Sequence, residues 1–342
     1  MTFTRTITLA VAGLALALGL GAARTAAAET KIKFTLDWVI QGPTSPFLYA
    51  LQKGYYKAAG LDVTIDAGQG SAGALQRVAT GAYDMGFADI NALVEYNAKN
   101  PESQVKAVMM AYDAPPLGLY ALKKSGIKTP KDLEGKKLGA PVFDASFKLF
   151  PAYAAEVGID KSKITFVNLK PQLREPSLKD GSVDFISGHY FSSVLDLEKI
   201  GVPFSDIVVF SYADAGMDFY GNAVVASPKF IKESPAAIKA FVKETIRAWK
   251  EVVADPAAGV KAAHERDGLV DEALELKRLK MSIEKNVLTD YVKKNGFGDV
   301  DMARLQRSSD AVAAAVGIEK APKAADLFQE GFLPPKSERM FK

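Results

Sequence analysis

Cysteine is absent from the 342-residue chain, and histidine occurs only twice, at His189 and His264. A chain without cysteine gains nothing from disulfides, so its hydrophobic core must hold the fold. The same two shortages leave no cysteine nucleophile and no histidine spacing typical of a metal site. We therefore predict no catalytic residue, no bound metal and no cofactor.

An excess of one sign of charge is also lacking, because 43 lysines and arginines stand against 40 aspartates and glutamates. Removing Arg5 and Arg24 with the N-terminal segment brings the two signs still closer to balance. A surface that binds nucleic acid would need a clustered basic stripe. We therefore predict no nucleic-acid partner.

Long hydrophobic runs are missing from the chain after its first thirty residues. No stretch in that part approaches the roughly 18 apolar residues of a membrane-spanning helix. Within those thirty residues, Arg5 precedes an uncharged apolar run at 7–21, and Ala26 to Ala28 offer a small-residue cleavage site. This order is typical of a secretory signal. We predict that residues 1–28 are a signal peptide cleaved near Ala28 and that the mature protein lies in the periplasm. An uncleaved anchor is the alternative.

Short apolar segments alternate with helical segments from Lys31 onward, which predicts an α/β fold with largely parallel sheets. The expected strands are 32–36, 61–65, 85–88, 105–111, 137–140, 164–167, 185–187, 207–210 and 222–226. The expected helices between them are 47–59, 72–80, 90–99, 147–157, 171–179 and 191–200. The tail differs, because 235–254, 256–266, 271–286 and 300–316 all read as helices, with Trp249 on a core-facing stripe.

Part of this order occurs twice. Gly60–Asp62 ends a helix and leads into a strand, and Gly81–Asp84 does the same one helix later. Gly158–Asp160 and Gly181–Asp184 repeat the pattern about a hundred residues further on. The glycines stand where a helix ends and a left-handed residue is needed. The repeat favours two lobes of similar build over one continuous sheet.

Polar and aromatic residues gather just after the predicted strands. In an open parallel sheet, ligands bind outside the carboxyl ends of the strands, where helices begin with unsatisfied N–H groups. The predicted ligand-binding residues are Asp37, Trp38, Gln41, Thr44, Gly70, Ser71, Asp89, Asn91, Tyr112, Phe143, Asp144, Ser146, His189, Tyr190, Tyr212 and Asp214. Such a mixture of flat apolar faces and hydrogen-bonding groups is typical of small-molecule sites.

Several of these residues have a structural alternative. Ser71, Asp89 and Ser146 are also good helix N-caps. Trp38 could cover an edge of the core, and His189 could be a hydrogen-bonded structural residue. The argument for a site rests on their joint position at strand ends.

The charge of the candidate loops bears on the ligand. The loops hold no arginine, whereas a sulfonate or phosphate site often uses one as a planar partner. Their charged residues are Asp37, Asp89, Asp113, Asp144 and Asp214. An amine-bearing or neutral aromatic heterocycle is therefore favoured, although helix N-termini alone can bind an anion.

Four segments carry a family resemblance: Phe34–Trp38, Ala50–Val63, Gly81–Gly86 and Lys131–Gly139. With these segments the chain resembles the periplasmic solute-binding proteins of ABC importers. The class in question includes binders of thiamine pyrimidine precursors, sulfonates, taurine and nitrate. The resemblance covers nearly the whole mature chain and does not specify the ligand.

The resemblance implies a two-lobed periplasmic binding protein fold, type II-like, each lobe a mostly parallel sheet flanked by helices. One lobe would comprise 29–123 and 222–342, and the other 124–221. It further implies a monomer that captures a small molecule between its lobes and delivers it to a membrane permease. The expected ligand is an aromatic heterocycle such as a pyrimidine-type thiamine precursor; a sulfonate, taurine or nitrate is the alternative. An enzyme of the same fold that makes the thiamine pyrimidine, or a sensor domain, would be different functions.

Overall fold

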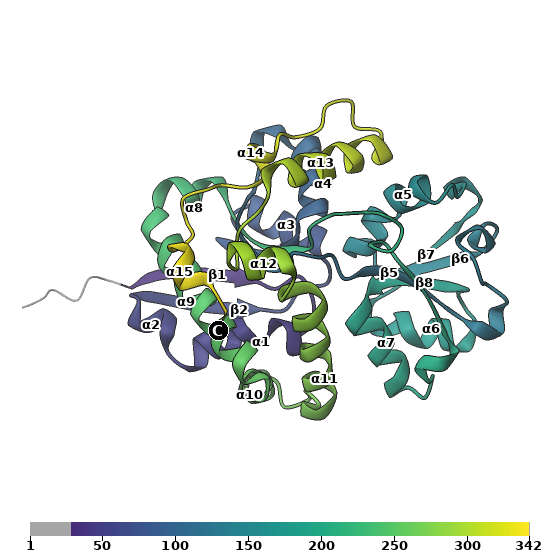
Figure 1. The fold of residues 1–342 in the computed structure, drawn as a ribbon, viewed down its shortest axis with the longest axis horizontal. Coiled ribbons are helices and arrows are strands. Elements are labelled where there is room, and N and C mark those ends of the chain that lie inside the picture. The colour runs from purple at the N-terminus through teal and green to yellow at the C-terminus, as the bar shows by residue number, and fades with distance from the viewer. Residues whose placement is uncertain (1–28, 342) are drawn as a thin grey trace, which may run out of the picture.

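The computed structural model describes residues 29–341, and the predicted signal peptide lies outside them. Two five-stranded sheets, each flanked by helices, form two lobes that lie side by side (Figure 1). Among residues 29–341, no helix is both long and apolar enough to cross a membrane.

The first sheet has the strand order β2-β1-β3-β10-β4. Its strands are β1 (Thr30–Thr35), β2 (Leu61–Asp66), β3 (Met85–Asp89), β4 (Lys106–Met110) and β10 (Asn222–Ala226). Strands β1, β2 and β3 are parallel as expected, whereas β10 is antiparallel to both β3 and β4. The sheet is therefore mixed.

The second sheet has the order β7-β6-β8-β5-β9 and repeats the arrangement of the first. Its strands are β5 (Leu117–Leu122), β6 (Lys137–Ala140), β7 (Thr165–Asn168), β8 (Phe185–His189) and β9 (Ile207–Ser211). Strands β6, β7 and β8 are parallel, and β5 is antiparallel to β8 and β9. Each lobe thus receives one antiparallel strand from the chain segment that has just crossed over from the other lobe.

Strand β5 corrects the predicted lobe boundary. No strand is expected there from the sequence, and the expected first lobe continues as far as Lys123. Because β5 pairs with β8 and β9, the first crossover lies before Leu117, at 111–116. The return crossover lies at 212–221, between β9 and β10, close to its predicted place.

The internal repeat is confirmed in detail. The Asp84 carboxylate accepts a 2.8 Å hydrogen bond from the backbone N–H of Lys33, and Asp184 does the same with Lys137. In each lobe the aspartate thereby ties the start of one central strand to its neighbour. The four predicted left-handed glycines all have positive φ: Gly60 (77°), Gly81 (76°), Gly158 (70°) and Gly181 (83°).

The helices cover both faces of the sheets (Figure 1). Those before the return crossover are α1 (Ser45–Gln52), α2 (Tyr55–Ala58), α3 (Ser71–Ala79), α4 (Ile90–Lys99), α5 (Ala145–Glu156), α6 (Arg174–Asp180) and α7 (Tyr190–Lys199). The tail contains α8 (Pro228–Glu233), α9 (Pro235–Ala254), α10 (Pro256–Arg266), α11 (Glu272–Ser282), α12 (Asp290–Asn295), α13 (Met302–Val316), α14 (Ala324–Leu327) and α15 (Lys336–Arg339). One predicted helix, 47–59, is interrupted because Gly54 has φ +70°, and α2 begins after it.

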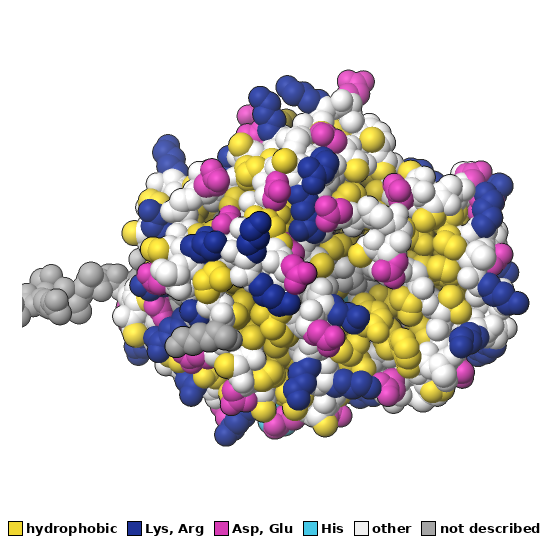
Figure 2. Space-filling view, in the orientation of Figure 1, with side chains coloured by type: hydrophobic (Ala, Val, Ile, Leu, Met, Phe, Trp, Pro, Cys, Tyr) yellow, Lys and Arg dark blue, Asp and Glu magenta, His cyan; other side chains and the backbone are white. Residues whose placement is uncertain are grey.

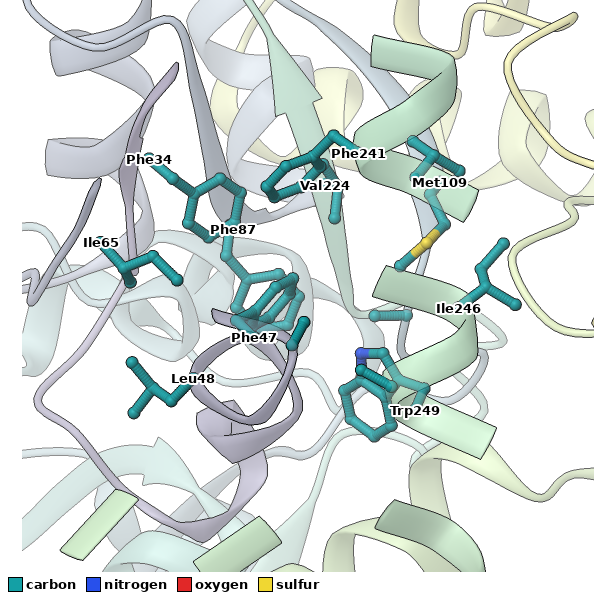
Figure 3. Packing of buried hydrophobic residues seen from close by; sticks show 14 of the residues in the cluster. Phe34, Phe47, Leu48, Ile65, Phe87, Met109, Val224, Phe241, Ile246 and Trp249 are labelled. Atoms are coloured by element: carbon teal, nitrogen blue, oxygen red, sulfur yellow. The ribbon is translucent and has the colours of Figure 1, made fainter. Parts of the chain in front are cut away.

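The core of the first lobe is aromatic (Figure 3). The ring of Phe34 lies 4.9 Å from that of Phe47 and 5.1 Å from that of Phe241, centroid to centroid. Trp249 on α9 is fully buried in the same cluster, which confirms its predicted core position. This packing supplies the stability that a chain without disulfides needs.

Candidate functional site

A cavity lies between the two lobes, at the carboxyl ends of their strands. Its free volume is about 30 Å³, enough for only one or two water molecules. The lining residues are Asp37, Trp38, Val39, Gln41, Pro43, Thr44, Gly70, Ser71, Phe87, Tyr112, Asp144, Ala145, Arg174, His189, Phe191, Ser192 and Asn222. A larger molecule would enter only when the lobes move apart.

Asp37 follows β1 and is the most perturbed acid on the cavity wall. Its Oδ2 accepts hydrogen bonds from Asn222 Nδ2 at 2.6 Å and from Ser71 Oγ at 3.3 Å. Burial raises the pKa of Asp37 from 3.8 to about 7, although both hydrogen bonds lower it. Asn222 is itself fully buried, and its Oδ1 has no hydrogen-bond partner among residues 29–341. The pair therefore offers two acceptors to a molecule that donates hydrogen bonds.

Arg174 at the start of α6 enters the cavity from the second lobe. Its Nη2 lies 2.6 Å from Glu175 Oε1, and its Nη1 lies 3.7 Å from Asp144 Oδ2. Its guanidinium lies 5.1 Å from the centre of the Trp38 ring, within cation–π range. The inference that the site lacks arginine is therefore wrong, because α6 supplies one that the candidate loops did not contain.

Asp144 and His189 line the cavity on the second-lobe side. Asp144 caps α5 by accepting a 2.8 Å hydrogen bond from the backbone N–H of Phe147, and it accepts another from Ser187 Oγ at 3.0 Å. Burial raises the pKa of Asp144, and Arg174 opposes that rise. Burial and the charge of Arg174 lower the pKa of His189 from 6.5 to about 3. The His189 ring is therefore neutral at physiological pH.

The predicted site residues divide into two groups. Those at the cavity wall are Asp37, Trp38, Gln41, Thr44, Gly70, Ser71, Tyr112, Asp144 and His189. Those that lie behind it or away from it are Asp89, Asn91, Phe143, Ser146, Tyr190, Tyr212 and Asp214.

Most of the second group have structural contacts instead. Asp89 caps α4 by accepting hydrogen bonds from the N–H groups of Asn91 (2.9 Å) and Ala92 (3.1 Å). The Tyr212 hydroxyl donates to the carbonyl of Ser146 at 2.8 Å.

Three further residues of the second group are exposed or pack elsewhere, so they do not line the cavity. The side chain of Phe143 is 42% exposed outside the cavity, Tyr190 packs against the second-lobe core, and Asp214 is exposed.

Several wall residues were not predicted. They are Val39, Pro43, Phe87, Ala145, Arg174, Phe191, Ser192 and Asn222. Arg174 stands shortly after β7, so its position after a strand is a sequence signal for it. Asn222 opens β10, which arrives from the other lobe, and no local pattern marks such a residue.

The lobes touch on both sides of the cavity. On one side, Ser192 Oγ donates to Gln41 Oε1 at 2.7 Å. On the other, the N–H of Ala72 donates to the carbonyl of Phe143 at 3.3 Å. Gly70 permits this approach, since it has φ +138° and a Cβ there would lie 2.2 Å from the Phe143 oxygen. The structure is therefore a closed form.

The family model described as NMT1/THI5 like matches residues 43–259, more than half of the chain. The chain belongs to the NMT1/THI5-like family. Over 214 residues, this NMT1/THI5-like protein is 25% identical to the riboflavin-binding protein RibY of Chloroflexus aurantiacus, covering 62% of this chain and 59% of RibY. Over 284 residues it is 26% identical to the 4-amino-5-hydroxymethyl-2-methylpyrimidine phosphate synthase THI13 of Saccharomyces cerevisiae, covering 78% and 82%.

Solved structures of similar fold include sulfonate-binding proteins. The alkanesulfonate-binding protein SsuA of Xanthomonas axonopodis, bound to MOPS, superposes with a TM-score of 0.68 at 17% identity, covering 88% of this chain and 99% of that one. The aliphatic sulphonate-binding protein SsuA of Escherichia coli gives 0.66 at 14% identity, covering 90% and 94%. The predicted two-lobed periplasmic binding protein fold is confirmed.

Proposed function

We propose that this chain is an extracytoplasmic solute-binding protein that closes on a small planar heterocycle carrying an amine or ring N–H. It acts as a monomer without catalysis and delivers the ligand to the permease of an ABC importer. The observation that carries this proposal is the pair of buried acceptors, Asp37 and Asn222 Oδ1, beside the Trp38 ring. An aminopyrimidine could stack on the indole while donating its N–H groups to both oxygens.

Other features support the transport role. The N-terminal pattern at 5–28 favours export. Lysines and arginines are interspersed with aspartates and glutamates over the viewed face (Figure 2), which fits a small-molecule rather than a nucleic-acid ligand. Relatives are named for riboflavin binding and for synthesis of a pyrimidine phosphate, and both are chemistries of nitrogen heterocycles.

A sulfonate, taurine or nitrate is the second candidate ligand, because solved neighbours are named for sulfonate binding and Arg174 lies in the cavity. Arg174 is already engaged by Glu175 and by Asp144. An anion would have to compete with those carboxylates for the guanidinium. The heterocycle is therefore favoured.

A ligand panel tests the proposal. The mature protein would be heated with 4-amino-5-hydroxymethyl-2-methylpyrimidine, riboflavin, taurine, an alkanesulfonate or nitrate, and its melting temperature followed by fluorimetry. A ligand that binds only the folded state stabilises it by about 2.7 kcal/mol at a hundred times its Kd. We expect the aminopyrimidine to raise the melting temperature. If only the sulfonates raised the melting temperature, the heterocycle would be contradicted as the ligand. Turnover of the pyrimidine by the protein would contradict the proposed absence of catalysis.

Replacing Trp38 should separate a ligand platform from a core residue. We expect Trp38→Ala to weaken binding of the panel's hit by roughly 1–3 kcal/mol, the scale of a lost aromatic stacking surface. Trp38→Phe should recover much of the loss, because it restores a flat ring. Titration calorimetry measures both.

The other tryptophan provides the matched control. Trp249 is fully buried, whereas Trp38 is only partly so. We expect Trp249→Phe to lower the melting temperature without changing the affinity of the folded protein. Lower thermal stability with unchanged affinity in Trp38→Ala would instead identify Trp38 as a core residue.

A further inference from the structure

Arg278 on α11 is a fully buried arginine that lies outside the cavity wall. Helix α11 belongs to the first lobe and stands on the side facing α7 of the second (Figure 1). A buried guanidinium is costly unless several acceptors satisfy it. The acceptors of Arg278 come from both lobes.

On its own lobe, Arg278 is held by Glu275. The Arg278 Nε lies 3.0 Å from Glu275 Oε1 and 2.9 Å from Oε2. Glu275 Oε2 also accepts a 2.6 Å hydrogen bond from the backbone N–H of Gly42. Gly42 directly follows Gln41, which lines the cavity. The Arg278–Glu275 pair is therefore hydrogen-bonded to the first-lobe loop that carries Gln41.

Across the gap, Arg278 binds α7 at two points. Its Nη1 donates to the carbonyl of Phe191 at 2.8 Å, and its Nη2 to Asp196 Oδ1 at 2.7 Å. Phe191 lines the cavity, as does Ser192 next to it. Both contacts form only when the lobes are together.

We propose that Arg278 is a positioning residue that latches the lobes in the absence of ligand, so that the empty protein rests in the closed form. When the lobes separate, Arg278 keeps Glu275 but exchanges Asp196 and the Phe191 carbonyl for water. Closure therefore completes the hydrogen bonding of the Arg278 guanidinium, which acceptors of the first lobe alone satisfy only in part. The inference concerns the empty protein and goes beyond the proposed transport function.

The distance between the lobes tests the latch directly. The chain has no cysteine, so Thr165→Cys on β7 and Lys261→Cys on α10 give two unique, exposed sites for spin labels. Without ligand, we expect pulsed electron resonance to show mostly the short distance. Adding Asp196→Asn removes one charge-assisted hydrogen bond, so the closed-to-open ratio should fall roughly tenfold to hundredfold.

A neighbouring ion pair supplies the matched control. Lys277 Nζ and Glu198 Oε2 also bridge α11 and α7, at 2.6 Å, but their side chains are 54% and 44% exposed. Such pairs contribute little, so Glu198→Gln should change the ratio at most about fivefold. An empty native protein that is mostly open, or equal distances in Asp196→Asn and native protein, would overturn the latch.

Scattering from unlabelled protein gives a second measurement. Asp196→Asn should have a larger radius of gyration than the native chain while keeping a cooperative melt. An unchanged radius would count against the latch. Because no ligand is added, the scattering result does not bear on the proposed ligand. In the same way, a ligand panel without a hit would not contradict the latch.

Discussion

Asp37→Asn is expected to weaken ligand binding and at the same time to stabilise the empty protein at alkaline pH. The amide keeps the shape of the carboxyl group but loses its charge, so a charge-assisted hydrogen bond of roughly 1.5–3 kcal/mol to the ligand is lost. Titration calorimetry with the aminopyrimidine would measure the loss. A sulfonate or nitrate should instead bind the variant as well as the native protein, or more tightly.

The stability effect follows from the direction of the pKa shift. Burial raises the pKa of Asp37 from 3.8 to about 7, so the folded state disfavours its ionised form. The protonated Asp37 side chain makes its full contribution to the free energy of unfolding below pH 4. That contribution is lost as the pH rises through about 7. Three pH units correspond to about 4 kcal/mol. Asp37→Asn should therefore raise the free energy of unfolding at pH 8 by a few kcal/mol, with no gain near pH 4, as measured by urea denaturation.

Asp89→Asn is the matched control. Burial raises the pKa of Asp89 to about 6, so this substitution should also stabilise the protein above that pH. Asparagine keeps the cap of α4, and Asp89 is absent from the cavity wall. We therefore expect its binding affinity to stay native. Tighter ligand binding by Asp37→Asn would refute the role of its carboxylate.

Strand β5 shows where reading the fold from sequence fails. The prediction located the other strands of both sheets, because turn residues punctuate them and apolar runs fill them. All six residues of Leu117–Leu122 are buried, so the alternation that marks a half-exposed strand is missing. The located strands β3 and β10 are buried at every residue too, so burial alone does not distinguish β5 from them. The pairing of β5 with β8 is decided by contacts with residues far away in the chain. For that reason the lobe boundary was misplaced.

The candidate site shows a similar division. Reading the residues after each strand located much of the cavity wall, since parallel strands bring their carboxyl ends to one edge. It could not separate Asp37 from Asp89, because both are aspartates that end a strand. In the structure the carboxylate of Asp89 faces the first amides of α4, whereas that of Asp37 faces Asn222. Only the contacts distinguish a cap from a wall residue.

Arg174 follows β7, so its position after a strand is a signal for it, but its composition and its neighbours do not mark it as buried. Within Arg174–Asp180 three further charged residues follow it, a composition that usually indicates a solvated face. Its burial depends on Trp38 from the other lobe and on Gly188, where a Cβ would lie 2.8 Å from the Arg174 Nη1. Trp38 is far from Arg174 in the sequence, and Gly188 belongs to the next strand, β8.

Arg174→Met should cost more stability than any other substitution considered for the cavity. The side chain is 2% exposed, and it neutralises the buried carboxylates of Glu175 and Asp144. Removing one partner of a buried ion pair leaves an uncompensated charge and costs roughly 3–5 kcal/mol. Urea denaturation at pH 7 should show a loss of this size. Adding Glu175→Gln should restore part of it, because one of the two unpaired carboxylates is then gone.

The same variant distinguishes an aminopyrimidine ligand from an anionic ligand. If Arg174 serves mainly to neutralise its carboxylates, Arg174→Met lowers stability whichever ligand is present, and the double variant with Glu175→Gln still binds the aminopyrimidine. If Arg174 instead anchors an anion, the double variant loses taurine or alkanesulfonate binding that the native protein has. We expect the first outcome, because Glu175 Oε1 already occupies the Nε–Nη2 edge of the guanidinium, at 2.8 Å and 2.6 Å, which is one of the two edges that could hold an anion.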